Sequence, residues 1–218
     1  MAVELYDEHE QSERVRGWLR ENGAALVVGV VLALGGIFGF RQWQAYQDGQ
    51  GALASDFYTA VQQEIEGDRL DAARDQLQRM QEAVGDHAYV DLSTMLLAGA
   101  EVQADELQAA REHYNVLLER TAGTALEPVV RLRLARLEAA ADQPDAGLAL
   151  LDIDAPVGFE GLWLETRGDL LAELGRTADA IAAYDEAVAR IEGEGNSARL
   201  VRTKLDALRS AAGESEAS

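Results

Sequence analysis

The side chains of this chain that could do acid–base or metal chemistry are three histidines and a large number of carboxylates. His9, His87 and His113 are far apart, and none has neighbours at the spacing of a zinc motif such as H-E-x-x-H. Adjacent acids, for example at 105–106 and 185–186, could act as a general acid and base, but the chain holds 39 acidic residues. Composition alone therefore accounts for such pairs, and we interpret most carboxylates as a solvated face.

The motifs that carry other chemistry are missing from the sequence. No glycine-rich phosphate loop precedes a Lys and a Ser or Thr, and no Gly-x-Ser-x-Gly nucleophile turn occurs. The chain has no cysteine, which excludes disulfides, thiol catalysis and thiolate metal sites. We therefore predict that the protein is not an enzyme and has no catalytic, cofactor-binding or metal-binding residues.

The net charge is strongly negative, because 39 acidic residues against 19 basic ones give −20 at pH 7. Such a field repels phosphate backbones, which makes nucleic acid a poor partner. Only 3 prolines interrupt a chain rich in alanine and leucine, so the composition favours helices as the elements that position these side chains.

One apolar stretch is long enough to cross a bilayer. From Asn22 to Phe40 no side chain is charged. As a helix this stretch would be ~28 Å long, close to the ~30 Å hydrocarbon core of a membrane. Trp18, Trp43 and Tyr46 flank it, where interfacial aromatic anchors occur. We predict a transmembrane helix at 22–43 and an N-terminal tail at 1–21.

A cleaved export signal and a buried core helix are the two alternatives for this stretch. A signal needs a basic start and a cleavage site of small residues close behind the apolar run. Here an acidic segment precedes the run, and Phe40-Arg41-Gln42-Trp43 ends it. A core helix usually carries a polar stripe, and none occurs from Gly23 to Phe40. A permanent anchor fits better than either.

The arginines around the span predict its orientation. Arg14, Arg16 and Arg20 precede the span, whereas only Arg41 follows it closely. Because positive residues are retained on the cytoplasmic side, we expect the tail in the cytoplasm and the C-terminal domain across the membrane. In a bacterium this is a single-pass inner-membrane protein with a periplasmic domain.

Small residues recur at four-residue spacing along the predicted membrane helix. Such residues allow helices to approach closely in lipid, which suggests a contact with a membrane partner. Glycine is also common in membrane helices in general, so both explanations stay open. The candidate packing residues are Ala25, Gly29, Ala33, Gly35 and Gly39.

A repeat fills the remainder of the chain. GDRLDAAR at 67–74 and ADELQAAR at 104–111 agree at Asp, Leu, Ala, Ala and Arg, and looser copies follow at 142–150 and 175–184. In each copy a small residue precedes a large apolar one by four positions, as expected where two helices cross closely. The nearly constant interval between copies is typical of stacked helix pairs. The residue pairs are Ala73 and Leu77, Ala110 and Tyr114, Ala146 and Leu150, and Ala180 and Tyr184.

The last copy resembles the tetratricopeptide repeat, because Gly168, Ala180, Tyr184 and Ala187 fall at its signature positions. The third copy is shifted around Pro144, so its register stays open. We predict an all-α fold in which a tetratricopeptide-like α-solenoid of three to four helix pairs, with a C-terminal capping helix, follows one N-terminal transmembrane helix. The repeat domain is expected at 44–210 and a disordered tail at 211–218.

A stack of helix pairs presents a groove that is lined by the first helix of each pair. The inner positions would include Leu92, Met95 and Val102 in the second unit, and Glu165 and Asp169 in the last. One end of the groove would be apolar and the other acidic, which suits an extended or helical segment of a protein partner. The apolar residues could equally belong to the core.

Three parts of the chain together carry a more specific resemblance: ELYDEHEQ near the start, RVRGWLRENGAALVVGVVLALGGIFGFRQWQ through the span, and a degenerate helical-repeat domain behind it. They resemble the YfgM family of bacterial inner-membrane proteins. The resemblance implies an ancillary subunit of the Sec translocon that works with a membrane-anchored periplasmic chaperone of the peptidyl-prolyl isomerase type. Exported polypeptides leaving the channel would be its clients, and a link to envelope stress signalling is implied too.

Three functions can be compared on these grounds. The first is a membrane-tethered adaptor or co-chaperone of the export machinery, which binds protein and catalyses nothing. The second is a structural scaffold of envelope or division complexes that uses the same groove. The third, an enzyme or small-molecule binder within the repeats, has the least support, because no convergent polar cluster is visible in the sequence.

Overall fold

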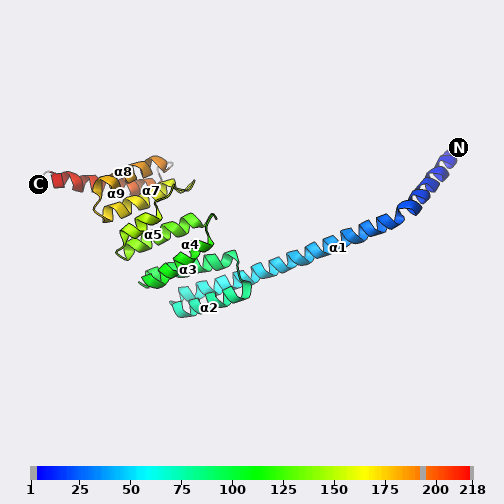
Figure 1. Ribbon diagram of the computed structural model, residues 1–218, viewed down its shortest axis with the longest axis horizontal. Coiled ribbons are helices and arrows are strands. Elements are labelled where there is room, and N and C mark those ends of the chain that lie inside the picture. The colour runs from blue at the N-terminus through cyan, green and yellow to red at the C-terminus, as the bar shows by residue number, and fades with distance from the viewer. Residues whose placement is uncertain (1–3, 192–194, 217–218) are drawn as a thin grey trace. The chain divides into compact units, whose positions relative to one another are not determined.

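The structure of the chain is a computed structural model that describes residues 4–191 and 195–216, and all secondary structure in this part is helical. The all-α prediction is confirmed. The chain forms two compact units, Met1–Leu53 and Ala54–Ser218 (Figure 1). The helices are α1 (Glu4–Glu66), α2 (Leu70–Val84), α3 (Ala88–Gln103), α4 (Leu107–Arg120), α5 (Glu127–Ala140), α6 (Pro144–Leu150), α7 (Glu160–Glu173), α8 (Thr177–Arg190) and α9 (Asn196–Glu216).

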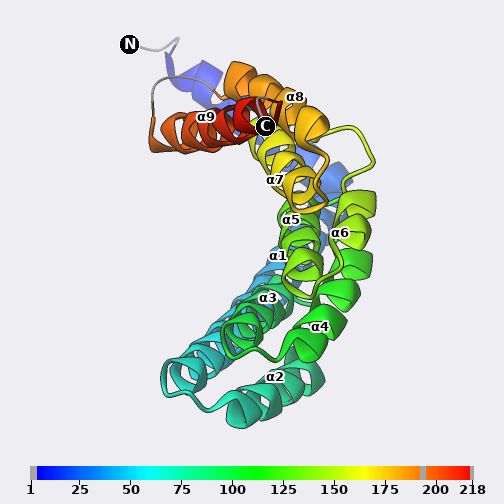
Figure 2. The same cartoon turned by 90° about the vertical axis from the view of Figure 1, so that its left-hand side faces the viewer.

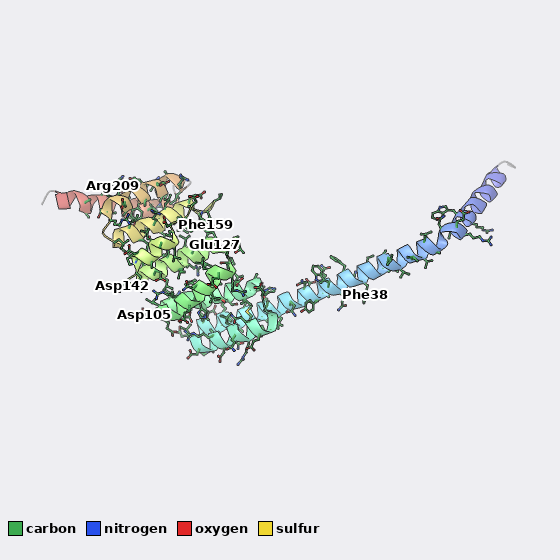
Figure 3. All side chains as sticks on the ribbon, viewed as in Figure 1. Phe38, Asp105, Glu127, Asp142, Phe159 and Arg209 are labelled. Atoms are coloured by element: carbon green, nitrogen blue, oxygen red, sulfur yellow. The ribbon has the colours of Figure 1, made fainter. Side chains whose placement is uncertain are left out.

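The first unit consists of the N-terminal part of α1. This helix is long and apolar enough to cross a membrane, and none of its most apolar window is buried. Val31, Leu32 and Phe38 are all more than half exposed, and Figure 3 shows Phe38 extending away from the ribbon. Soluble monomers rarely expose so continuous an apolar surface, so length, composition and exposure together make α1 a candidate membrane span.

The second unit is a curved stack of helix pairs. Figure 2 shows α3, α5 and α7 along its inner side and α2, α4, α6 and α8 along its outer side, with α9 at the C-terminal end. The last turns of α1 pack with α2 and α3 around Ala54 and Val61, and they act as the first helix of the first pair. The unit thus has four pairs followed by a closing helix, as the repeats predict.

A residue with left-handed backbone conformation marks the turn inside each pair. Asp68, Asp105 and Asp142 have φ of 54°, 62° and 58°, and Gly175 has φ of 70°. Glycine enters this region without steric cost, and Asp tolerates it because its short side chain can bond locally. These turns follow one another at nearly equal intervals along the chain, so the backbone itself gives the period of the array.

Each pair buries one residue of its first helix together with a small residue of its second helix. The number of residues between the two positions is the same in every pair. From one pair to the next, both positions recur at the same spacing as the turn residues. A small side chain here lets the two helix backbones approach closely. The pairs of residues are Val61 and Ala73, Ala98 and Ala110, Ala135 and Gly147, and Gly168 and Ala180.

The third pair differs from the predicted register by a single position. Ala146 is exposed and Leu150 is half-buried, whereas Gly147 and Leu151 are buried. A Cβ on Gly147 would lie 2.5 Å from the carbonyl oxygen of Ala135, so α6 approaches α5 more closely than an alanine would allow. Two small residues are adjacent here, and the sequence pattern selected the wrong one because alanine matched the other copies.

Ion pairs join neighbouring helix pairs at a repeated position. Arg74 Nε of α2 donates to Glu101 Oε1 of α3 at 2.9 Å, and Arg111 of α4 donates to both oxygens of Glu138 of α5 at 2.8 and 2.7 Å. Both carboxylates are buried, and the same interval separates each from its arginine. At the next junction, between the third and fourth pairs, Leu148 replaces the arginine and Leu171 replaces the glutamate, and both belong to an apolar cluster.

The closing helix extends beyond the predicted end of the domain. A disordered tail was expected at 211–218, whereas α9 continues to Glu216. Two alanines follow Ser210, and alanine has the highest helix propensity, so nothing stops the helix at that point. The end of the repeat domain is corrected accordingly for the residues that the structure describes.

The register of the third pair can be tested by Gly147→Ala. The added methyl would collide with the backbone of α5, so we expect the free energy of unfolding to fall by about 1–3 kcal/mol in chemical denaturation. Gly99→Ala is the control, because the nearest atoms to its new Cβ are 3.7 and 3.9 Å away. That variant should be neutral or more stable by up to about 1 kcal/mol. Equal behaviour of the two variants would contradict the corrected register.

Candidate functional site

The apolar end of the predicted groove lies on α3. Leu92 is 38% exposed, and Val102 is half-buried and packs against the neighbouring core cluster. Met95 is only 7% exposed and belongs to that cluster together with Ala98 and Tyr114. Leu92 and Val102 are therefore partly available to a partner, whereas Met95 is a core residue and its assignment to the groove is corrected.

The acidic end of the groove is occupied by the closing helix. Lys204 Nζ of α9 donates to Glu165 Oε1 at 2.9 Å and to the two oxygens of Asp169 at 2.7 and 2.9 Å. Glu165 is almost completely buried as a result. The two carboxylates predicted to face a partner instead hold α9 against α7, and the only lysine of the chain forms ion pairs with both.

Tyr184 of α8 completes this network. Its hydroxyl donates to Asp169 Oδ1 at 2.6 Å. A Cβ on Gly168 would lie 2.7 Å from the tyrosine ring, so the missing side chain of Gly168 lets the ring cross α7 and reach the carboxylate. The signature residues Gly168 and Tyr184 are thus linked to Lys204 through Asp169, across three helices.

The charges of this network change the titration of two of its members. Burial raises the pKa of Tyr184, and the hydrogen bond to Asp169 and the nearby charges of Glu165 and Glu173 act in the same direction. Burial alone would lower the pKa of Lys204, but its hydrogen bonds to Asp169 and Glu165 outweigh that effect and raise the pKa. Both groups therefore stay protonated throughout the neutral range.

A pocket of ≈ 740 Å³ lies where α5, the start of α6 and α7 meet. Arg136 Nη2 donates to Thr166 Oγ1 at 2.9 Å across it. Side chains of both charge signs line this space, so it offers polar contacts in the middle of the array. The lining residues are Arg136, Ala139, Ala140, Asp142, Pro144, Thr166, Asp169, Leu170 and Glu173.

The repeat-signature residues form the interior of the array and do not reach a partner. All those outside the third pair are buried, with exposed fractions of 4% or less for the side chains that have a Cβ. Their positions follow the helix crossings described above, with the corrected Gly147 and Leu151 in the third pair. The buried set is Ala73, Leu77, Ala110, Tyr114, Gly168, Ala180, Tyr184 and Ala187.

The small residues of the first unit lie on the open surface of α1. Ala25, Gly29 and Ala33 share one face and line a shallow depression together with Trp18 and Asn22. Gly35 and Gly39 have no atom within 4 Å of an added Cβ, apart from the helix itself. These positions are open to close approach by another helix, and their role in packing stays a prediction.

The histidines have structural roles where their side chains are described. His87 Nδ1 accepts a hydrogen bond from the backbone N–H of Tyr89 and caps α3. His113 Nδ1 lies 2.7 Å from Glu101 Oε2, beside the ion pair of Arg74. Within the described ranges, no three histidine or carboxylate side chains are grouped so that they could hold a metal ion.

Removing the cation of the α7–α9 network should destabilise the repeat unit. Lys204→Met leaves two partly buried carboxylates without their positive partner, and we expect a loss of about 1–3 kcal/mol at pH 7 in chemical denaturation. Arg209→Met is the matched control, because Arg209 lies on the same helix as Lys204 and its ion pair with Asp185 of α8 is half-exposed, so it should contribute within about 0.5 kcal/mol. A similar loss in both variants would contradict a special role for Lys204.

The pH dependence of this effect has a defined sign. Because the pKa values of Lys204 and Tyr184 are raised on folding, their stabilisation is fully present below their unfolded-state values and is lost as pH rises through the folded-state values. The stability difference between wild type and Lys204→Met should therefore be constant from about pH 6 to about pH 10 and should shrink at higher pH. A difference that shrinks between pH 6 and 8 would contradict the network.

The chain is similar to curated bacterial proteins over part of its length. It is 35% identical over 68 residues to the ancillary SecYEG translocon subunit of Haemophilus influenzae, an alignment that covers 31% of this chain and 33% of the relative. It is 40% identical over 57 residues to the ancillary SecYEG translocon subunit of Escherichia coli, covering 26% and 28%. The chain thus matches about a third of these relatives, and their description confirms the resemblance to the YfgM family.

Solved structures and a family model describe the repeat fold. A tetratricopeptide repeat protein from Parabacteroides merdae superposes with a TM-score of 0.59 at 17% identity, over 76% of this chain and 63% of that chain. At this identity the likeness shows the fold alone. A family model described as "Tetratricopeptide repeat-like domain" matches residues 16–210, which include both the apolar segment and the helix pairs. The chain therefore belongs to the tetratricopeptide repeat-like domain family.

Proposed function

We propose that this protein is a membrane-tethered adaptor of the Sec translocon, which uses its repeat unit to bind protein and catalyses nothing. The observation that carries the proposal is the similarity to two relatives that are both described as ancillary SecYEG translocon subunits. The candidate membrane helix and the array of helix pairs agree with this role, because one element supplies an anchor and the other a binding surface.

The anchor supports the proposed role through local concentration. A domain tethered by one helix stays close to a membrane complex, and its effective concentration there can reach about the millimolar range. Contacts of low affinity are then sufficient, which suits a protein that meets many different chains. Leu92 and the half-buried Val102 offer an apolar surface for such contacts on the inner side of the array.

The proposal includes a periplasmic location of the repeat unit. Three arginines precede the apolar segment and one follows it, which favours a cytoplasmic N-terminus. On that side of the membrane the domain would meet exported polypeptides as they leave the channel. A membrane-anchored chaperone of the isomerase type is the second proposed partner, on the grounds of the family resemblance.

Site-specific photocrosslinking in intact cells tests the partner assignment. With a photoreactive amino acid at Leu92, we expect crosslinks to translocon subunits and to an isomerase-type chaperone. Val116 is the control position, because it is 51% exposed on the outer helix α4. Exclusive recovery of division or cell-wall proteins from position 92 would favour the scaffold alternative and contradict the proposal.

A reporter fused after Ser218 tests the orientation. Alkaline phosphatase, which needs the periplasm to become active, should be active in this fusion, whereas a fusion after Arg20 should be inactive. The excess of arginines before the apolar segment is the physical reason for this orientation. Removing that excess with Arg14→Gln, Arg16→Gln and Arg20→Gln should therefore lower the phosphatase activity of the fusion at Ser218. An inactive fusion at Ser218 would reverse the proposed orientation.

A further inference from the structure

The network in the fourth helix pair has a counterpart in the second pair that lacks one component. In the fourth pair, Asp169 follows Gly168 and accepts hydrogen bonds from Tyr184 Oη and from Lys204, which the next helix on the inner side supplies. The arrangement thus consists of a carboxylate, a phenol donor from the same pair and a cation from the following helix.

Gly99 stands in the second pair where Asp169 stands in the fourth. It follows Ala98, the equivalent of Gly168. It also precedes Tyr114 by the same interval that separates Asp169 from Tyr184. The following inner helix, α5, supplies Arg133 beside it. The phenol and the cation are therefore present, whereas the carboxylate is replaced by a residue without a side chain.

The geometry around Gly99 matches this correspondence. An ideal Cβ built on Gly99 would have Arg133 Nη1 at 3.7 Å and Tyr114 Oη at 3.9 Å as its nearest neighbours. Within the part of the chain that the structure describes, Arg133 makes no ion pair and Tyr114 Oη makes no hydrogen bond. Arg133 is also exposed. In a chain of net charge −20, an arginine without an acidic partner beside a phenol is poised to bind a negative group.

We infer that Gly99, Tyr114 and Arg133 form a receptor for a carboxylate of a bound polypeptide, which takes the position that Asp169 fills in the fourth pair. Two donors converge on this position, and a charged acceptor makes the stronger hydrogen bonds with them. Leu92 and Val102 lie on the same helix as Gly99, so the segment bound would carry an acidic group beside apolar side chains. This inference rests on the proposed protein-binding function of the inner surface.

A double-mutant cycle tests the receptor without any ligand. Gly99→Asp supplies the carboxylate within the chain, and Gly99→Asn is the matched control with nearly the same shape and helix propensity. In full-length protein we expect Gly99→Asp to have the higher unfolding midpoint, by about 2–4 °C for a domain of this size. The difference should vanish when Arg133→Gln is present. Equal midpoints for the two variants with Arg133 intact would overturn the inference.

Peptide binding tests the proposed ligand directly. The probes are fluorescent, end-blocked nonapeptides of alternating leucine and serine with a central glutamate, glutamine or lysine, and a fourth peptide with a free C-terminal carboxylate in place of an internal one. Full-length protein in lipid nanodiscs should bind the glutamate peptide roughly ten-fold more tightly than the glutamine peptide. Arg133→Gln and Gly99→Asp should abolish this preference, so that the glutamate and glutamine peptides bind each variant equally. Tighter binding of the fourth peptide than of the glutamate peptide would identify a chain terminus as the preferred source of the carboxylate.

The failures can be told apart. Equal binding of the glutamate and glutamine peptides by the wild type would overturn the carboxylate receptor while leaving the protein-binding groove intact. Failure of all four peptides to bind would contradict both. Loss of crosslinks to translocon subunits, with the glutamate preference retained, would contradict the proposed Sec association but not the receptor.

Discussion

Close contact between the two helices of each pair is the constraint on which the rest of this molecule depends. One small residue per pair, at Ala73, Ala110, Gly147 and Ala180, allows the backbones to approach, and a left-handed turn residue reverses the chain between them. Once that spacing is fixed, the large residue one turn later fills the remaining space, and the first helices form a continuous inner surface. The shape of the inner surface is therefore set by the contacts between the inner and outer helices of each pair, and these contacts are buried beneath that surface.

The sequence predicted the architecture well because its strongest signals are repeated. The apolar segment, the helix pairs and the closing helix each follow from periodicity or composition. The third pair was misplaced by a single position because Ala146 and Gly147 are both small, and only the backbone of α5 distinguishes them. Asp68 and Asp105 were matched as part of the repeat, but their left-handed conformation at the turns was not predicted, although Asp68, Asp105 and Asp142 recur at equal intervals.

The candidate site was harder to predict than the fold, because it depends on which carboxylates have partners. The interpretation of the acids as a solvated face missed the buried Glu101 and Glu138, whose arginines precede them by the same interval in both copies. Glu165 and Asp169 were assigned to an open groove, since nothing in the local sequence indicates that Lys204 returns to them from a distant helix. Whether a carboxylate is buried or exposed depends here on contacts between neighbouring helix pairs. The sequence of a single repeat does not show these contacts.

The engagement of Lys204 also bears on how contacts of this protein can be observed. Lys204 is the only lysine of the chain, and its amine is held by two carboxylates on a partly buried surface. Surveys of neighbouring proteins that rely on amine-reactive crosslinkers would therefore record few contacts of the repeat unit, whatever its true partners are. Reagents that couple carboxylates, or photoreactive residues placed by design, suit a surface with 39 acidic residues in the chain.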